Sequence, residues 1–317
     1  MKRGSMLRGL LAVEWAALAY LLFTVVMMLV ERNELADPVP MIRGRIAFVA
    51  ATLAAWAAYR LRPCRLTLLL RIGVQMAALA WWYPDTYELN RMLPNCDHVF
   101  ARLDQSLFGC QPALLFSQRA PWGWFSELMC LGYASYYPLM VVVALYYFFR
   151  RQRDFVMATS VILTSFYVYY VVFDILPVVG PQYYYPAVGL DQVAAGVLPD
   201  VGLWFQTHSE ALPVPGWSGG LFHHLVEQAH AAGERPTAAF PSSHVGVTVI
   251  LVLLALHSGS RRLLAVVLPL FVLMCFATVY IRAHYFVDVV AGLLTGTALY
   301  YLLRRLYPPL RLCPSAC

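Results

Sequence analysis

The sequence predicts an all-α membrane protein with about eight transmembrane helices. Of its 317 residues, 61% are hydrophobic and only 13% are charged, and the mean hydropathy is +0.63. Soluble globular domains carry about 25% charged residues. Apolar runs recur along the whole chain, and a helical run of about 20 residues crosses about 30 Å of hydrocarbon.

The apolar runs predict where the spans lie within one membrane domain, residues 1–317. We expect spans at residues 9–30, 46–59, 66–83, 124–149, 155–176, 241–257, 263–280 and 283–303. Residues 1–176 form a scaffold, and residues 241–303 form the core helices that carry the candidate site. Residues 177–240 contain no spanning run, so we expect a lid or re-entrant segment with a short interfacial helix at 221–232.

Basic residues predict the orientation in the membrane. They cluster in alternate loops, at Lys2, Arg3 and Arg8; Arg60, Arg62 and Arg65; Arg150, Arg151 and Arg153; Arg261 and Arg262; and Arg304, Arg305 and Arg311. The positive-inside rule places these loops and both termini in the cytoplasm of a bacterial-type inner membrane. The net charge of +6 therefore reflects topology, and we expect the bilayer rather than nucleic acid as the partner.

Two cysteines share the predicted outer loop at residues 84–121. Cys96 and Cys110 face an oxidising compartment in this topology, where a disulfide is allowed. We hypothesise a bond between them.

The candidate site lies at the starts of two of the core helices. His244 ends the motif Phe240-Pro241-Ser242-Ser243-His244. Proline suits a first helical turn, and a helix start with small polar residues such as Ser242 and Ser243 binds anions through free N–H groups. Ionisable groups at such depth are costly and mark functional sites. A phosphate is the anion that we expect there.

His284 and Asp288 form the second half of the candidate site. They are four residues apart, so they share one helix face, where the carboxylate accepts the imidazole N–H. The other ring nitrogen then keeps its lone pair as a nucleophile, and His244 donates a proton to the departing oxygen. Such a double displacement needs no metal and no cofactor.

These two motifs resemble signatures of a known enzyme family. Phe240 to His244 and Ile281 to Gly292 are similar to the second and third motifs of the type 2 phosphatidic acid phosphatase superfamily, whose members work through a phosphohistidine. The resemblance implies that His284 is the nucleophile, Asp288 its partner and His244 the acid. It also implies that Ser242 and Ser243 bind phosphate and that the substrate is a membrane lipid carrying a phosphate or phospho-head group.

The sequence departs from the common pattern in its cations. Thr278 stands where the third motif has an arginine, and Gln228 stands where the first motif has a lysine. The remaining candidate phosphate ligands are Arg282, Arg235 and Gln182. Together with the stretches at residues 124–137 and 180–181, these departures resemble the branch of inositol phosphorylceramide synthases, which transfers a head group to a second lipid.

Several alternatives stay open at this stage. The enzyme either transfers the phosphoryl-type group to an acceptor alcohol or hydrolyses a lipid phosphate or diphosphate. A different class of protein, a proton-coupled carrier or flippase, would use His244, His284 and Asp288 as a proton relay. Arg282 either binds phosphate or anchors the last span at the interface. The histidines at 223, 224 and 230 are interpreted as structural rather than as a metal site.

Overall fold

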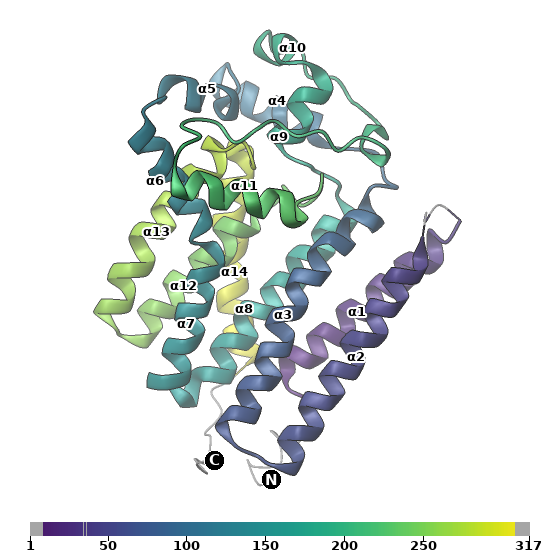
Figure 1. Cartoon of the computed structure of the whole chain (residues 1–317), viewed down its shortest axis with the longest axis vertical. Coiled ribbons are helices and arrows are strands. Elements are labelled where there is room, and N and C mark those ends of the chain that lie inside the picture. The colour runs from purple at the N-terminus through teal and green to yellow at the C-terminus, as the bar shows by residue number, and fades with distance from the viewer. Residues whose placement is uncertain (1–8, 34, 36, 308–317) are drawn as a thin grey trace.

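The computed structural model describes residues 9–33, 35 and 37–307, and within them the secondary structure is entirely helical (Figure 1). In chain order the elements are α1 (Ala12–Val30), α2 (Pro38–Leu61), α3 (Arg65–Asn90), α4 (Asp97–Phe108), α5 (Pro112–Arg119), α6 (Gly123–Ala134), α7 (Tyr136–Arg150), α8 (Gln152–Ile175), α9 (Pro181–Val188), α10 (Leu190–Ala194), the 3-10 helix η2 (Trp204–Gln206), α11 (Leu221–Gly233), α12 (Ser243–Ser258), α13 (Arg261–Tyr280) and α14 (Phe286–Leu306).

The predicted all-α membrane class is confirmed. Fewer than the eight predicted spans are long enough to count as membrane-crossing helices. Six described helices are long and apolar enough to cross a membrane, namely α1, α2, α3, α8, α13 and α14. The pair α6 and α7, bent by 49°, makes a seventh if it counts as one span. The expected span at 241–257 is α12, which has only 16 residues because Ser242 caps its start and Gly259, in the left-handed conformation, ends it.

The predicted outer segments contain more helix than the sequence indicated. Residues 84–121, expected as a loop, hold the end of α3 and the whole of α4 and α5. The interfacial helix expected at 221–232 is present as α11.

The hypothesised disulfide between Cys96 and Cys110 is wrong, because both are free cysteines in the structure. Cys96 precedes α4 and Cys110 follows it. A helix rises 1.5 Å per residue, so this intervening helix holds the two thiols about 20 Å apart, whereas a disulfide needs Cα atoms within about 7 Å.

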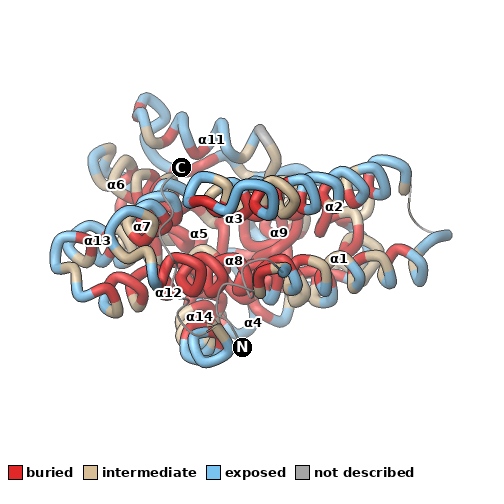
Figure 2. The backbone as a smooth tube through the Cα atoms, turned by 90° about the horizontal axis from the view of Figure 1, so that it is seen from below, coloured by how far each residue is buried: buried red, intermediate tan, exposed pale blue. Residues whose placement is uncertain are grey.

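Helix α8 forms the centre of the bundle. Seen from below, it is buried among helices whose outer faces are exposed (Figure 2). It packs against α1, α3, α7, α12 and α14. The short helices α4, α5, α9, α10 and α11 gather at the opposite end of the bundle from the arginine-bearing junctions α2–α3, α7–α8 and α12–α13 (Figure 1).

Three glycines allow α12 and α14 to approach closely. A Cβ atom on Gly292 would lie 2.5 Å from the Ser242 carbonyl oxygen, and one on Gly296 would lie 2.2 Å from the Gly246 carbonyl oxygen. A Cβ on Gly246 would in turn meet the Tyr169 hydroxyl at 1.8 Å. Small residues four apart on one helix are the usual means by which membrane helices pack backbone to backbone. The contact holds the starts of these two helices side by side.

Replacing Gly292 by alanine should therefore destabilise the protein. The new methyl group has no room against the backbone of α12, and overpacking of this kind costs about 1–3 kcal/mol. We expect a lower Tm in detergent for Gly292→Ala. Gly73→Ala on α3 is the matched control, because a Cβ there meets nothing within 4 Å. An equal Tm for the two variants would contradict the close packing.

Candidate active site

The structure brings the two motif histidines into direct contact. His244 lies in the first turn of α12, and His284 lies in the loop between α13 and α14. His284 Nε2 is 3.3 Å from His244 Nδ1, and the ring centroids are 5.5 Å apart. The His244 ring also stacks on the Tyr133 ring and packs at a tilt against the Tyr136 ring, at centroid distances of 4.6 and 4.3 Å. These contacts fix both imidazoles.

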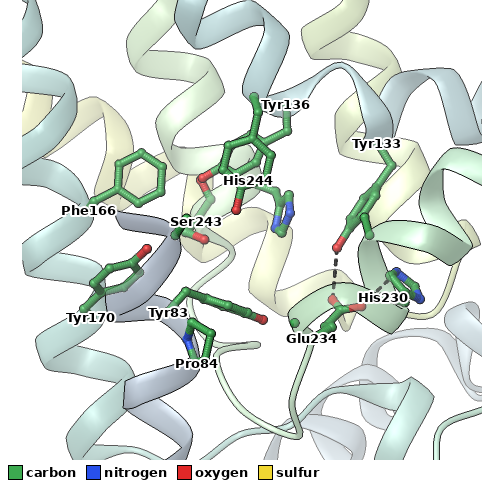
Figure 3. Close-up of a pocket in the computed structure, with 14 residues that line it drawn as sticks. Tyr83, Pro84, Tyr133, Tyr136, Phe166, Tyr170, His230, Glu234, Ser243 and His244 are labelled. Atoms are coloured by element: carbon green, nitrogen blue, oxygen red, sulfur yellow. Dashed lines mark hydrogen bonds and ion pairs between the residues drawn. The ribbon is translucent and has the colours of Figure 1, made fainter. Parts of the chain in front are cut away.

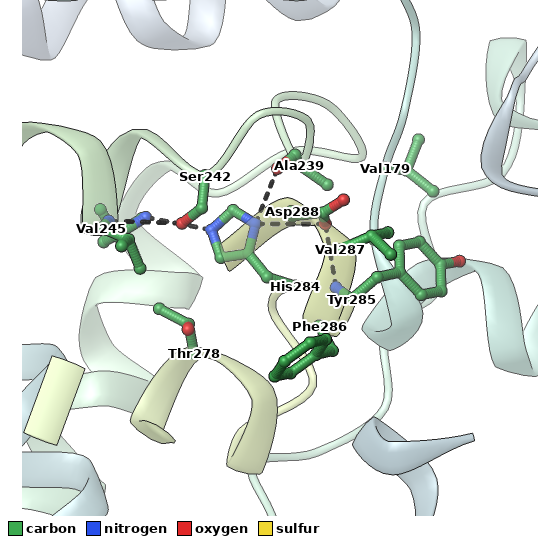
Figure 4. Close-up of polar contacts among 12 residues, drawn as sticks. Val179, Ala239, Ser242, Val245, Thr278, His284, Tyr285, Phe286, Val287 and Asp288 are labelled. Carbon is green, nitrogen blue, oxygen red and sulfur yellow. Dashed lines mark hydrogen bonds and ion pairs between the residues drawn. The ribbon is translucent and has the colours of Figure 1, made fainter. Parts of the chain in front are cut away.

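A backbone carbonyl orients His284. Its Nδ1 lies 2.7 Å from the Ala239 carbonyl oxygen and 3.5 Å from Asp288 Oδ2 (Figure 4). The sequence predicted that Asp288 would accept the imidazole N–H, whereas Ala239 is the nearer acceptor. Asp288 Oδ2 accepts the Tyr285 N–H at 2.9 Å and so caps its own helix. Asp288 remains a close polar neighbour of the ring.

The bond to Ala239 determines the tautomer of His284. A carbonyl only accepts hydrogen bonds, so Nδ1 carries the proton and Nε2 keeps its lone pair. The contact between the rings then requires His244 Nδ1 to donate. Burial lowers the pKa of His284 to about 4, although the Ala239 carbonyl and the charge of Glu234 act in the opposite direction. At neutral pH the ring is therefore an uncharged base.

The start of α12 provides donors beside this pair. The polar groups of Ser242 already have partners within the protein. Its hydroxyl accepts the Val245 N–H at 3.4 Å, and its N–H donates to the Asp288 carbonyl oxygen at 3.1 Å. The N–H groups of Ser243 and His244 occupy the first two helical positions, where no intrahelical acceptor exists. The helix dipole adds partial positive charge at this point, so an anion is favoured there.

The other predicted phosphate ligands lie in different settings. The Arg282 guanidinium donates to the Ser117 hydroxyl of α5 at 3.3 Å, and burial lowers the pKa of this arginine. Its carbonyl oxygen accepts the Gln182 N–H at 2.8 Å, and Gln182 is buried. Arg235 is exposed. Thr278, at the position of the family arginine, is buried and its carbonyl oxygen accepts the His284 N–H.

Two acids of α4 position the site, and the sequence analysis missed both. Asp97 accepts the N–H groups of Val179 and Gly180 and the Tyr285 hydroxyl, at 2.7, 2.8 and 2.9 Å. Asp104 accepts the N–H groups of Phe286 and Val287 at the start of α14, at 2.8 and 3.1 Å. Burial raises the pKa of Asp104 to about 6 despite these donors. The one available signal was their spacing of seven residues, which places both carboxylates on one face of a helix.

A cavity of about 400 Å³ opens beside the histidine pair (Figure 3). Ser243 and His244 form part of its wall. The rest comes from α3, α6, α7, α8 and α11 and is mainly aromatic; its polar side chains include the pair His230 and Glu234. His244 can therefore be reached from the cavity.

One described cluster has the donor atoms of a metal site. On α11, His223, His224 and Glu227 place their ligand atoms within 4.8 Å of one another, although His224 and Glu227 are exposed. The sequence analysis had counted the histidines without this acid. The cluster is separate from the pair His244 and His284.

The comparisons with known proteins agree with the geometry. The family model described as PAP2 superfamily matches residues 98–302, more than half of the chain. The chain therefore belongs to the PAP2 superfamily, a class of phosphatases and phosphotransferases. No curated protein and no solved structure matches it.

The low pKa of His284 predicts how stability depends on pH. Unfolding restores the ordinary pKa of about 6.5. Between pH 6.5 and about 4, His284 therefore binds a proton in the unfolded chain but stays neutral in the folded chain. Stability is thus lost as pH falls through this window, by up to about 3 kcal/mol from this group. In His284→Asn, which keeps a donor for the Ala239 carbonyl, the fall in Tm between pH 7 and 4 should be smaller. The exposed His224→Asn is the control and should follow the wild type.

Asp97→Asn should destabilise the loops around His284. The amide replaces one carboxylate oxygen by a group that cannot accept, and at least one buried donor loses its partner, at about 1–3 kcal/mol. Thermal unfolding in detergent measures the loss. Asp191→Asn on α10 is a matched exposed control. Identical Tm values for the two variants would show that Asp97 does not hold these loops.

Proposed function

We propose that this protein is an integral membrane lipid phosphatase or phosphotransferase that works through a phosphohistidine on His284 and requires no metal. The observation that carries the proposal is the arrangement of the two imidazoles. His284 Nε2 is an unprotonated nitrogen held by the Nδ1 bond to Ala239, and it faces a proton-bearing nitrogen of His244 at 3.3 Å. A nucleophile beside an acid is the minimum set for displacement at phosphorus.

The proposed reaction has two displacements. In the first, His284 Nε2 attacks phosphorus, the bond from phosphorus to the leaving oxygen breaks, and His244 gives its proton to that oxygen. In the second, a water or alcohol oxygen attacks phosphorus, the phosphorus–nitrogen bond breaks, and His244 takes the proton that this oxygen carried. The first N–H groups of α12 stabilise the charge on the phosphoryl oxygens.

The proposed location is the outer face of a bacterial-type inner membrane. The His284 loop and the start of α12 lie toward the end of the bundle that holds α4, α9 and α11, away from the arginine-bearing junctions (Figure 1). Placing those junctions in the cytoplasm puts the site on the other side, where it meets lipid head groups.

For the substrate we favour transfer of an inositol-phosphoryl type of head group. The sequence features at residues 124–137 and 180–181 and the threonine at 278 support this choice. Plain hydrolysis of a lipid phosphate or diphosphate is the alternative, because both reactions share the first displacement.

The proposal is tested by trapping the phosphoenzyme. Purified protein in detergent with EDTA receives lipid phosphates, lipid diphosphates and phosphatidylinositol, with and without a diacylglycerol or ceramide acceptor. We expect an acid-labile phosphoryl adduct in the wild type and its loss, with a fall in turnover of roughly 10³-fold or more, in His284→Ala. The exposed His224→Ala is the control.

The products distinguish the two reactions. Free phosphate that depends on His284 indicates the hydrolase, and a new phospholipid that appears only with acceptor indicates the transferase. Absence of any adduct or product, or loss of activity in EDTA, would overturn the phosphohistidine mechanism and favour the carrier.

A further inference from the structure

A second histidine and carboxylate pair lies in the cavity that His244 opens into, and the proposed reaction does not use it. His230, in the last turn of α11, places Nε2 2.9 Å from Oε2 of Glu234, the residue after the helix. Glu234 Oε1 accepts the Tyr133 hydroxyl at 3.2 Å. The side chains of His230 and Glu234 are only 18% and 11% exposed. Figure 3 shows the pair facing into the same space as His244.

Glu234 is an ionised acid in a largely enclosed place. Burial by itself raises the pKa of this carboxyl, but the charge of His230 and hydrogen bonds from His230, Tyr133 and Gln182 outweigh burial and lower the pKa below its usual value. Burial of an ionised carboxylate is unfavourable by itself, and the contact with His230 offsets that cost. Because His230 and Glu234 lie at the wall of a cavity, their polar atoms can contact a ligand.

The side chains that line the cavity limit what it binds. No lysine or arginine is among the described residues that line it. This side therefore offers a phosphoryl group no arginine or lysine, whereas the start of α12 attracts one on the other side. The carboxylate accepts from a hydroxyl, and the imidazole of His230 is a second polar partner for a neutral head.

The remaining wall suits the hydrocarbon of a lipid. It consists mainly of aromatic side chains: Tyr83 from α3, Tyr136 and Tyr137 from α7, and Phe166 and Tyr170 from α8. Aromatic rings provide large apolar contact areas with a polar tip. The cavity therefore joins an apolar wall to the polar side chains of His230, Glu234, Ser243 and His244.

From these observations we infer that the His230 and Glu234 pair, with the aromatic wall beside it, is the binding site for the acceptor, a neutral lipid alcohol whose hydroxyl resolves the phosphohistidine. This inference rests on the proposed function for its role in turnover. In the bound alcohol the hydroxyl donates to Glu234. As the oxygen attacks phosphorus, the hydroxyl donates instead to His244, which takes its proton. His230 and Glu234 bind the alcohol, and neither gives up nor keeps a proton in the reaction.

Binding tests the inference without requiring turnover. The probe is dioctanoylglycerol, titrated against protein in detergent and followed by thermal shift in the His284→Ala background. Adding Glu234→Gln keeps the shape of the side chain and removes its charge, and we expect the apparent Kd to rise at least tenfold. Glu210→Gln, at an exposed loop position, is the matched control and should leave the Kd unchanged. Ala229→Trp, which fills the cavity from α11 without altering the pair, should also weaken binding.

Turnover provides the second measurement. With His284 intact, Glu234→Gln should raise the KM for dioctanoylglycerol at least tenfold and change kcat much less. A Kd for Glu234→Gln equal to that of its parent would overturn the inference, as would tighter binding of inorganic phosphate than of the diacylglycerol at this pair. If the wild type forms no phosphoenzyme but binding still depends on Glu234, the proposed function fails while the lipid-alcohol site stands.

Discussion

The hydrogen bond from His284 to the Ala239 carbonyl oxygen is the interaction on which the site depends. It fixes which ring nitrogen carries the proton, and it directs the free lone pair of the other nitrogen at His244. A backbone carbonyl cannot be protonated in the working range of pH, so the tautomer stays constant while neighbouring acids titrate. The loop that carries Ala239 precedes α12, so the residue that orients one histidine and the helix that carries the other are parts of one segment.

Buried carboxylates hold this arrangement by accepting backbone N–H groups. Asp288 caps the start of α14 from within, and Asp104 of α4 caps it from outside, while Asp97 joins the loop before α9 to Tyr285. Each carboxylate satisfies donors that would otherwise be buried without partners. The site is therefore supported by a layer of short helices, and the loop between α13 and α14 has little freedom.

Charge is distributed unevenly around the two histidines. The first turn of α12 contributes a positive helix end on one side, and Glu234 contributes a carboxylate on the other side, across the cavity. In the proposed reaction, such a division separates a phosphoryl group from a neutral partner. It also offers a physical reason why a threonine is tolerated at 278, because the helix end replaces part of the missing cationic charge.

The sequence by itself determined the membrane class, the positions of most long helices, α11 in the lid segment, and the pairing of the motifs around His244 and His284. These features follow from local patterns: apolar length, capping residues and spacing within one helix turn. Only the tertiary structure decided that Ala239 orients His284, that Asp97 and Asp104 hold the surrounding loops, and that His230 and Glu234 enter the same cavity. His230 and Glu234 are only four residues apart, but the contacts of Ala239, Asp97 and Asp104 join residues 45 to 188 positions apart along the chain. No periodicity connects such positions, and it is the packing of α4, α11, α12 and α14 that brings them together.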